Sequence, residues 1–308
     1  AKIENSARVV PTAVEFVDIA GLVKGASEGQ GLGNQFLAHI RQVDAILEVV
    51  RLFRDSNITH VGGDIDPKGD IGTIHTELLL ADLQTLDKRL TKEAKEAKTN
   101  PKLQPKIDFY QKLKNHLDSG QPARTFSSTE AETAWLKELF LLTTKPILYA
   151  ANIDEEQLRE ADLADKLAGQ LKILKEEILL VNAKLEEDLA QLTPEEQAEL
   201  LNDLQITEPG LNKVIRSSYN LLDLITFFTT GPDETRAWTV KTGAKAPEAA
   251  GVIHTDFTKG FIRAEVVSYD DLISAGSWKK AGENGKLRSE GKDYIFQDGD
   301  VAHFRFNV

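Results

Sequence analysis

Short apolar runs alternate with amphipathic stretches along much of the chain. Four runs have the length and composition of buried strands, and they cover residues 14–18, 45–53, 147–151 and 178–181. Residues 34–40, after the first run, have the pattern of a helix. Strands that alternate with helices are typical of a parallel α/β sheet. The pattern therefore predicts an α/β fold with a parallel sheet.

A long helical insertion separates the second run from the third. Residues 71–98 keep helical periodicity throughout, with leucines at 4-3-4 spacing, namely Leu79, Leu83, Leu86 and Leu90. Asn100 and Pro101 interrupt the pattern, and apolar positions resume it over residues 103–117. Two such stripes predict an antiparallel helical hairpin with a coiled-coil seam. The hairpin is either a structural insertion or an arm that binds a partner, and the pattern favours neither.

The C-terminal part of the chain has the pattern of a compact α+β module. Residues 211–228 predict a helix that runs into a strand, and further strands are predicted at residues 235–240, 260–267 and 301–306. We therefore expect an α/β domain in two parts, an inserted hairpin and a C-terminal module. In chain order these segments are residues 1–68, 69–143, 144–224 and 225–308.

Composition narrows the class of protein. The net charge of -12 argues against a protein that coats nucleic acid, although the nearly neutral region after Thr226 leaves room for a local RNA-docking surface. The absence of cysteine excludes disulfides and thiol chemistry. No run approaches the ~20 apolar residues of a membrane helix, and the first residues lack a signal-peptide pattern. We therefore expect a cytoplasmic protein with no membrane partner.

The first apolar run ends in a candidate phosphate-sensing motif. Asp18-Ile19-Ala20-Gly21 has the form D-x-x-G, and a glycine-rich loop follows it. In P-loop nucleotide switches this carboxylate holds the magnesium shell, and the glycine N–H meets the γ-phosphate. We therefore predict that Asp18 binds Mg²⁺ through water and that Asp18 and Gly21 belong to the catalytic site.

The third and fourth runs each end in a candidate base-reading loop. The first loop, Asn152-Ile153-Asp154-Glu155, stands where a guanine-reading protein has N-K-x-D, whose last carboxylate accepts from two guanine N–H groups. The longer Glu155 side chain misplaces that acceptor, so guanine selection should be lost. The second loop, Asn182-Ala183-Lys184, is similar to the S-A-K loop that closes over a bound base. We predict that Asn152, Ile153 and Glu155 line the base pocket and that residues 182–184 close it.

Together these motifs make the chain similar to the YchF/Obg-like ATPase family of P-loop proteins, over essentially its whole length. The segments that carry the resemblance are the two base-reading loops and residues 14–27, 31–34, 236–240, 251–257 and 297–300. The resemblance implies that the protein binds ATP in preference to GTP, with Mg²⁺, and that its C-terminal module is a β-grasp (TGS) domain. It also implies a switch associated with the ribosome or RNA, with the hairpin in the place of the family's coiled-coil arm.

The chain departs from this family at the phosphate site. It contains no G-x-x-x-x-G-K-[ST] motif and no upstream switch I threonine. It also begins at Ala1 in mid-pattern and has no methionine. The sheet of this chain is therefore expected to be N-terminally incomplete, and the chain alone should not hold a triphosphate productively. The sequence leaves open whether the intact protein carries the phosphate-binding loop, and the expected ATPase activity requires it.

Leu22 directly follows the D-x-x-G motif. Ras-like enzymes place a glutamine there to orient the attacking water, and a leucine cannot do so. The resemblance implies a class in which another group, or a partner, positions the water. We therefore expect slow ATP hydrolysis.

One alternative belongs to a different functional class. The chain would then be an RNA-, ribosome- or protein-binding adaptor that uses the helical arm and the C-terminal module without turnover. Lys279, Lys280, Lys286 and Arg288 are candidate phosphate contacts for this role, although ordinary surface charge explains them as well. The acidic residues 155–160 and 186–188 are interpreted as solvated helix faces.

Overall fold

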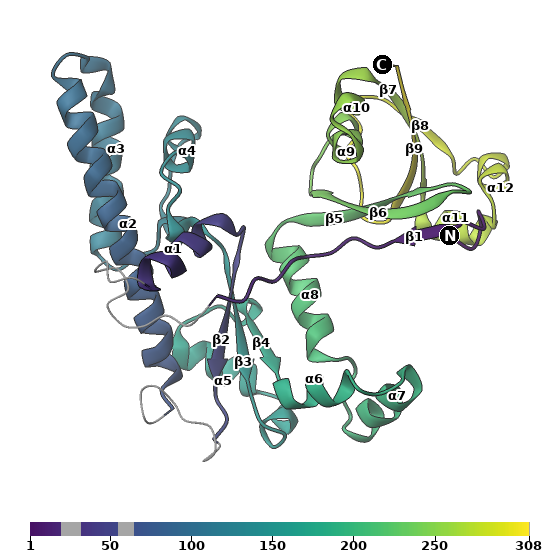
Figure 1. The fold of residues 1–308 in the computed structure, drawn as a ribbon, viewed down its shortest axis with the longest axis horizontal. Coiled ribbons are helices and arrows are strands. Elements are labelled where there is room, and N and C mark those ends of the chain that lie inside the picture. The colour runs from purple at the N-terminus through teal and green to yellow at the C-terminus, as the bar shows by residue number, and fades with distance from the viewer. Residues whose placement is uncertain (20–31, 55–64, 308) are drawn as a thin grey trace. The chain divides into compact units, whose positions relative to one another are not determined.

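A computed structural model describes residues 1–19, 32–54 and 65–307 of the chain. These residues form two compact units (Figure 1). One unit contains Ala1–Phe16 and Tyr219–Val308, and the other contains Val17–Ser218. No helix in the described part of the chain is both long enough and apolar enough to cross a membrane.

The unit Val17–Ser218 is built on three parallel strands, β2 (Ile46–Arg51), β3 (Ile147–Asn152) and β4 (Ile178–Val181), which lie in that order. The first five residues of the central strand β3 are buried, as expected for a parallel strand covered on both faces. These strands confirm three of the four predicted runs. The shorter helices of this region are α1 (Leu32–Gln42), α4 (Glu130–Lys137), α5 (Leu163–Leu171), α6 (Ala183–Leu189), α7 (Pro194–Asp203) and α8 (Gly210–Leu221).

The predicted strand at residues 14–18 is wrong. Residues 11–19 have no strand geometry, and the side chains of Phe16 and Val17 are 48% and 52% exposed. An apolar run becomes a strand only where a neighbouring strand satisfies its backbone N–H and C=O groups. Among the described residues, the three-stranded sheet pairs β2 with β3 and β3 with β4, and no strand pairs with residues 14–18. Asp18 therefore lies in irregular, exposed chain.

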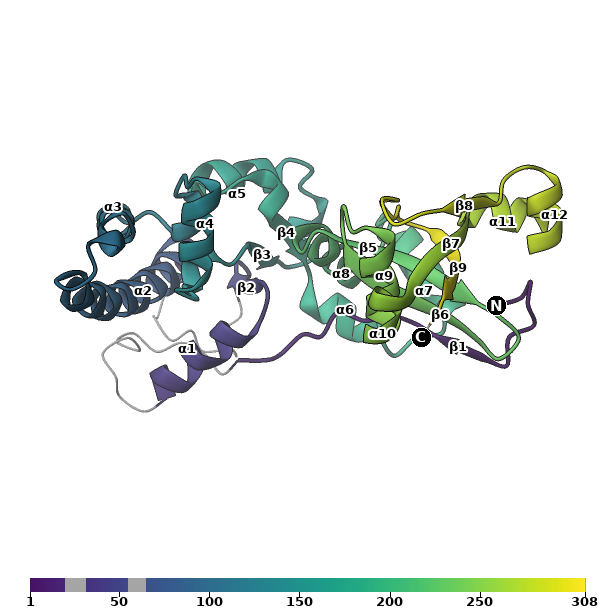
Figure 2. The same ribbon diagram turned by 90° about the horizontal axis from the view of Figure 1, so that it is seen from above.

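The predicted helical hairpin is present. Helix α2 (Pro67–Ala97) and helix α3 (Gln104–Asp118) lie side by side in both views (Figure 1, Figure 2). Asp66 caps the start of α2 by accepting a hydrogen bond from the backbone N–H of Gly69, and Pro67 fits the first helical turn. The seam between the helices buries apolar side chains from both, which include Leu86, Phe109, Tyr110, Leu113 and Leu117.

The C-terminal unit contains a mixed sheet of six strands in the order β1–β6–β5–β9–β7–β8. The strands are β1 (Arg8–Val10), β5 (Leu224–Thr230), β6 (Glu234–Lys241), β7 (Phe261–Ser268), β8 (Arg288–Glu290) and β9 (Asp300–Phe306). The helices are α9 (Ala246–Ile253), α10 (Thr255–Gly260), α11 (Tyr269–Ala275) and α12 (Trp278–Glu283). The strands predicted at residues 235–240, 260–267 and 301–306 are confirmed, and β9 takes an interior place in the sheet.

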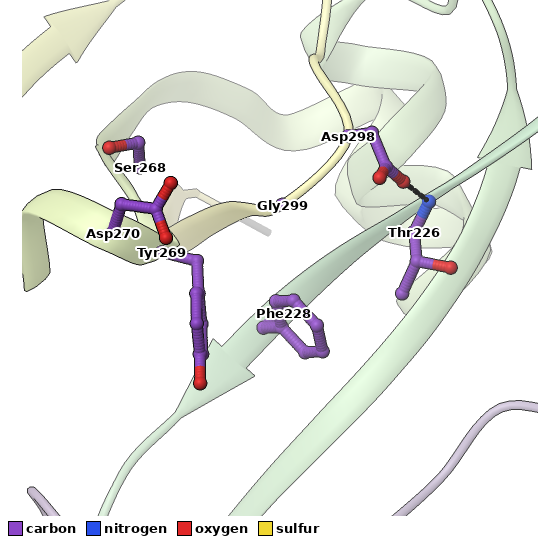
Figure 3. A pocket seen from close by; sticks show the side chains of 7 residues that line it. All are labelled: Thr226, Phe228, Ser268, Tyr269, Asp270, Asp298 and Gly299. Carbon is purple, nitrogen blue, oxygen red and sulfur yellow. Dashed lines mark hydrogen bonds between the residues drawn. The ribbon is translucent and has the colours of Figure 1, made fainter. Parts of the chain in front are cut away.

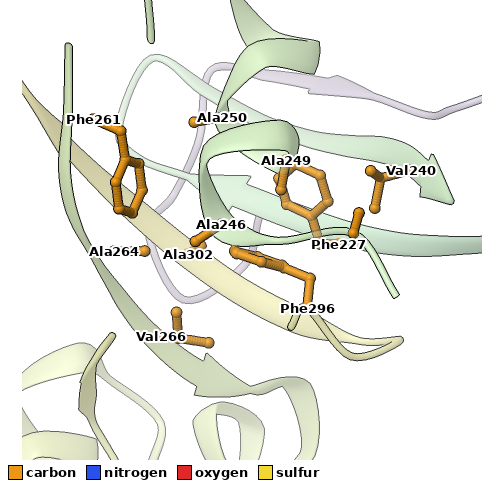
Figure 4. Close-up of a cluster of buried hydrophobic side chains, with 11 residues drawn as sticks. Phe227, Val240, Ala246, Ala249, Ala250, Phe261, Ala264, Val266, Phe296 and Ala302 are labelled. Carbon is orange, nitrogen blue, oxygen red and sulfur yellow. The ribbon is translucent and has the colours of Figure 1, made fainter. Parts of the chain in front are cut away.

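The core of this unit lies between the sheet and α9 (Figure 4). Helix α9 contributes Ala246, Ala249 and Ala250, all fully buried, and these small side chains let the helix approach the sheet closely. The rings of Phe227 and Phe296 fill the remaining space, with their centroids 5.0 Å apart in an edge-to-face arrangement. A helix packed on a mixed sheet in this way is the predicted β-grasp arrangement.

The N-terminal residues belong to this second sheet. Strand β1 pairs in parallel with β6, with Arg8 opposite Glu234. Side-chain hydroxyls extend the contact, because the hydroxyl oxygens of Ser6 and Thr235 lie 2.7 Å apart. The predicted domain division placed residues 1–16 with the α/β domain, and the structure differs there because β6 offers its edge to this segment.

Candidate nucleotide-binding site

The two predicted base-reading loops meet at the carboxyl ends of β3 and β4. Asn152 is the last residue of β3 and lies opposite Val181, the last residue of β4. The backbone N–H of Ile153 donates to the carbonyl oxygen of Val181 at 2.9 Å, which continues the ladder one step past the strand. The backbone N–H of Ala183 donates to Oδ1 of Asn152 at 3.1 Å. The asparagine side chain therefore ties one loop to the other.

The loop after β3 is anchored by a buried side chain and by hydrogen bonds, and it also contains an exposed turn. Ile153 is only 2% exposed and packs among the buried side chains next to α5, so it anchors the loop in the core. Asp154 and Gln157 exchange hydrogen bonds between their side chains and backbone N–H groups, at 2.9 and 3.1 Å. Between these anchors Glu155 is exposed in a turn.

The loop after β4 becomes the start of a helix. Asn182 is 5% exposed and is the N-cap of α6, because its Oδ1 accepts from the backbone N–H of Leu185 at 2.8 Å. An asparagine in place of the usual serine preserves this capping function. Ala183 and Lys184 follow on the exposed surface of the first turn.

Sequence reasoning missed a second carboxylate at this edge of the sheet. Glu186 accepts hydrogen bonds from the backbone N–H groups of Gly210 and Leu211, at 2.6 and 3.1 Å, and so caps the start of α8. A Cβ at position 210 would lie 3.0 Å from the Glu186 carboxylate, so a larger residue there would push this side chain away. The interpretation of residues 186–188 as a solvated face is therefore wrong for Glu186. The adjacent Pro209 and Gly210, a helix-start signal, were the available clue.

The phosphate end of the predicted site is described only in part. Asp18 is exposed and lies outside any strand or helix. Gly21 and Leu22 lie outside the described residues. The structure therefore brings together the predicted base-binding residues and leaves their relation to Gly21 and Leu22 a prediction.

Several buried carboxylates lie where α2 packs, and two of them, Asp82 and Glu48, connect α2 to the strands or to the segment before β3. Asp82 of α2 is 1% exposed and accepts from the backbone N–H groups of Leu142 and Thr143, at 2.7 and 2.8 Å, and from the Thr143 hydroxyl. Burial raises the pKa of Asp82 above its ordinary value, although these three donors act in the opposite direction. Asp82 therefore joins the arm to the segment that leads into β3.

The second buried carboxylate is Glu48 of β2, which is 5% exposed. Its Oε2 lies 3.6 Å from Nε2 of His75 on α2, and the same nitrogen lies 2.9 Å from the Tyr149 hydroxyl on β3. Burial raises the pKa of Glu48 and also that of Tyr149. The cluster links the arm helix to both strands.

The fold and the joined loops define a class of protein. A parallel sheet with two predicted base-reading loops at adjacent strand ends, an inserted helical hairpin and a β-grasp unit is the architecture of a P-loop GTPase-type protein with an added C-terminal domain. Family models agree at both ends of the chain. The model described as "50S ribosome-binding GTPase" matches residues 2–99, and the YchF-GTPase C-terminal model, described as "Protein of unknown function", matches residues 224–307.

Individual relatives extend over the whole chain. The "Ribosome-binding ATPase YchF" of Bacillus subtilis is 51% identical over 99% of this chain and 84% of its own length. That of Haemophilus influenzae is 48% identical over 100% of this chain and 85% of its own length. A solved structure, the Schizosaccharomyces pombe YchF GTPase, superimposes with a TM-score of 0.82 at 36% identity, covering 99% of this chain and 83% of that one. The chain belongs to the YchF family.

Proposed function

We propose that this protein is a ribosome-associated molecular switch that hydrolyses ATP in preference to GTP. The observation that carries the proposal is the joined pair of loops, in which Asn152 binds the second loop while Glu155 stands where a guanine-reading aspartate would be. The relatives' printed names, ribosome-binding ATPases, support both the nucleotide and the partner. The domain division made from the sequence belongs to this proposal, with residues 1–16 moved to the C-terminal unit.

The described residues fit the base end of a bound nucleotide. Oδ1 of Asn152 is used by Ala183, while its amide nitrogen has no protein partner within the described ranges and remains available to an acceptor on the base. Glu155 is exposed beside it, and residues 182–184 form the exposed start of α6. Asp18 would hold the magnesium shell, which supplies charge neutralisation of the phosphates when ATP is bound. Gly21 would meet the γ-phosphate, and Leu22 would leave water positioning to another group.

Restoring the guanine-reading carboxylate tests the base preference. In Glu155→Asp the shorter side chain reaches the position that accepts from guanine. We expect kcat/KM for GTP relative to ATP to rise about tenfold, the value of one well-placed hydrogen bond. Glu156→Asp, in the same exposed turn, is the matched control and should leave the ratio unchanged. An unchanged ratio in Glu155→Asp would remove Glu155 from the base site.

The adaptor alternative receives less support from the surface charges proposed for it. Lys286 lies 3.2 Å from a carboxylate oxygen of Asp271, and Arg288 lies 3.3 Å from one of Asp300. These cations are therefore partly neutralised. Turnover by the intact protein that is lost in Asp18→Ala supports the switch. Salt-sensitive ribosome binding that needs no nucleotide, with no turnover, would instead establish the adaptor.

A further inference from the structure

A hollow of about 370 Å³ opens on the C-terminal unit, away from its core (Figure 3). Three segments meet around it: the middle of β5, the start of α11, and the turn that precedes β9. The lining residues are Thr226, Phe228, Ser268, Tyr269, Asp270, Asp298 and Gly299.

Hydrogen bonds fix the walls of this hollow. Oδ1 of Asp298 accepts from the backbone N–H of Thr226 at 2.8 Å, and the N–H of Gly299 donates to the Thr226 carbonyl at 2.8 Å. The N–H of Tyr269 then donates to the Gly299 carbonyl at 2.9 Å. Gly299 has a φ of +82°, a left-handed conformation that glycine adopts without strain. The hollow is therefore preorganised by backbone contacts.

The side chains around the hollow combine aromatic rings with carboxylates. The ring centroids of Phe228 and Tyr269 are 6.2 Å apart, and Tyr269 is 51% exposed. In Figure 3 the Asp270 carboxylate lies next to Tyr269, and the Asp298 carboxylate lies on the other side of the hollow, beside the Thr226 nitrogen. Within the described ranges neither carboxylate has a basic partner, whereas the neighbouring Asp271 binds Lys286. Ile273, one helical turn beyond Tyr269, is also exposed, at 53%.

We propose that this hollow binds an arginine side chain of a basic polypeptide segment in a protein partner. A guanidinium stacks on an aromatic face and can donate from its planar fork to a carboxylate, and the second carboxylate adds to the negative charge around it. The exposed Ile273 would contact an aliphatic neighbour of that arginine. Two carboxylates repel phosphates, so a nucleic acid does not fit this face. The site goes beyond the proposed nucleotide switch and does not depend on it.

The chemistry can be tested with small probes. N-acetyl-arginine N-methylamide is titrated into the ¹⁵N-labelled intact protein and compared with the citrulline analogue, which keeps the shape without the charge. We expect saturable amide shifts at residues 226–228, 268–270 and 298–299 with the arginine probe, and at least fivefold weaker binding of the citrulline probe. Equal binding of the two probes, shifts confined to other residues, or no saturable shift would overturn the proposal.

Variants assign the effect to the hollow. Asp270→Asn with Asp298→Asn removes both charges, and the asparagine at 298 still offers an acceptor to Thr226. This pair should weaken the arginine probe about fivefold, while Asp233→Asn, an exposed carboxylate outside the hollow, should not. Tyr269→Phe should bind as well as the parent and Tyr269→Ala more weakly. Unaltered binding in the double variant, or a short RNA that shifts the same amides, would overturn the proposal.

Discussion

Polar side chains have different roles in two regions of the α/β unit, the carboxyl ends of its strands and the face on which α2 packs. At the carboxyl ends of β3 and β4, Asn152, Asn182 and Glu186 each accept from backbone N–H groups where loops become helices. Where α2 packs, Asp82 and Glu48 are almost fully buried. In the first group two of the three side chains are neutral amides, so even the buried Asn182 satisfies a helix start without burying a charge. In the second group burial disfavours the charge, and only Asp82 is compensated by several donors. The difference separates the loops for which we propose a base-binding role from the contacts that hold the arm.

The largest effect should come from Asp82→Ala. The change leaves two backbone N–H groups and a hydroxyl buried without an acceptor, so we expect a loss of about 3–5 kcal/mol in unfolding free energy. Urea unfolding followed by Trp135 fluorescence, in a Trp238→Phe and Trp278→Phe background, measures this unit alone. Asp82→Asn keeps one acceptor and should lose clearly less. Equal losses in the two variants would show that the volume of the side chain, and not its acceptors, matters.

Glu186→Gln tests the strand-end side of the comparison. The amide keeps one acceptor oxygen for Gly210 but loses the charge that favours a helix N-terminus, so we expect a loss of about 1–2 kcal/mol. Glu187→Gln, on the exposed face next to it, should change stability by under about 0.5 kcal/mol. The same urea experiment compares them. Equally small stability losses in the two variants would show that Glu186 contributes no more than an ordinary surface residue.

Glu48→Gln should act in the opposite direction and depend on pH. Burial raises the folded-state pKa of Glu48 above 4.5, although His75 and Arg124 act in the opposite direction and Asp70 acts with burial. The folded state therefore holds its proton more tightly, and the stability from this group is present below pH 4.5 and lost as pH rises through the raised pKa. The glutamine variant lacks that loss.

The measurement for Glu48 is a pair of unfolding free energies, one near pH 4.5 and one at pH 7. From the lower to the higher pH, the unfolding free energy of the glutamine variant should rise relative to that of the parent by about 1 kcal/mol. Glu176→Gln, an exposed glutamate before β4, should show no such gain. A variant that is less stable than the parent at pH 7 would contradict the prediction and show that the Glu48 carboxylate stabilises the cluster.

Sequence patterns could predict the features that depend on neighbouring residues, and they could not predict those that depend on distant partners. The runs that became β2, β3 and β4 have neighbours in the sheet, and so their local pattern was sufficient. Residues 14–18 also have apolar positions, but they have no paired strand among the described residues, and hydrogen-bonding partners are not visible in a short window of sequence. The partners of Asp82 and Glu186 lie 60 and 24 residues away, which hides both roles from periodicity. Asn152 and Asn182 were predictable because motif spacing itself encodes the strand ends.

The smallest changes in stability are expected at Asn182, and they help to decide whether the loop after β4 serves the base or only the start of α6. Asn182→Ala removes the acceptor for the N–H of Leu185 and should cost about 1 kcal/mol, whereas Asn182→Ser keeps a cap and should cost a few tenths. If the loop exists for the base, ATP affinity in the alanine variant should fall by more than the stability loss alone requires, measured by titration of the intact protein well below its unfolding temperature. Asn202→Ala, near the end of α7, is the matched control and should leave ATP affinity unchanged. If ATP affinity is unaffected in Asn182→Ala, this asparagine is a helix cap only, and the loop after β4 has a structural role, as the contacts of α2 do.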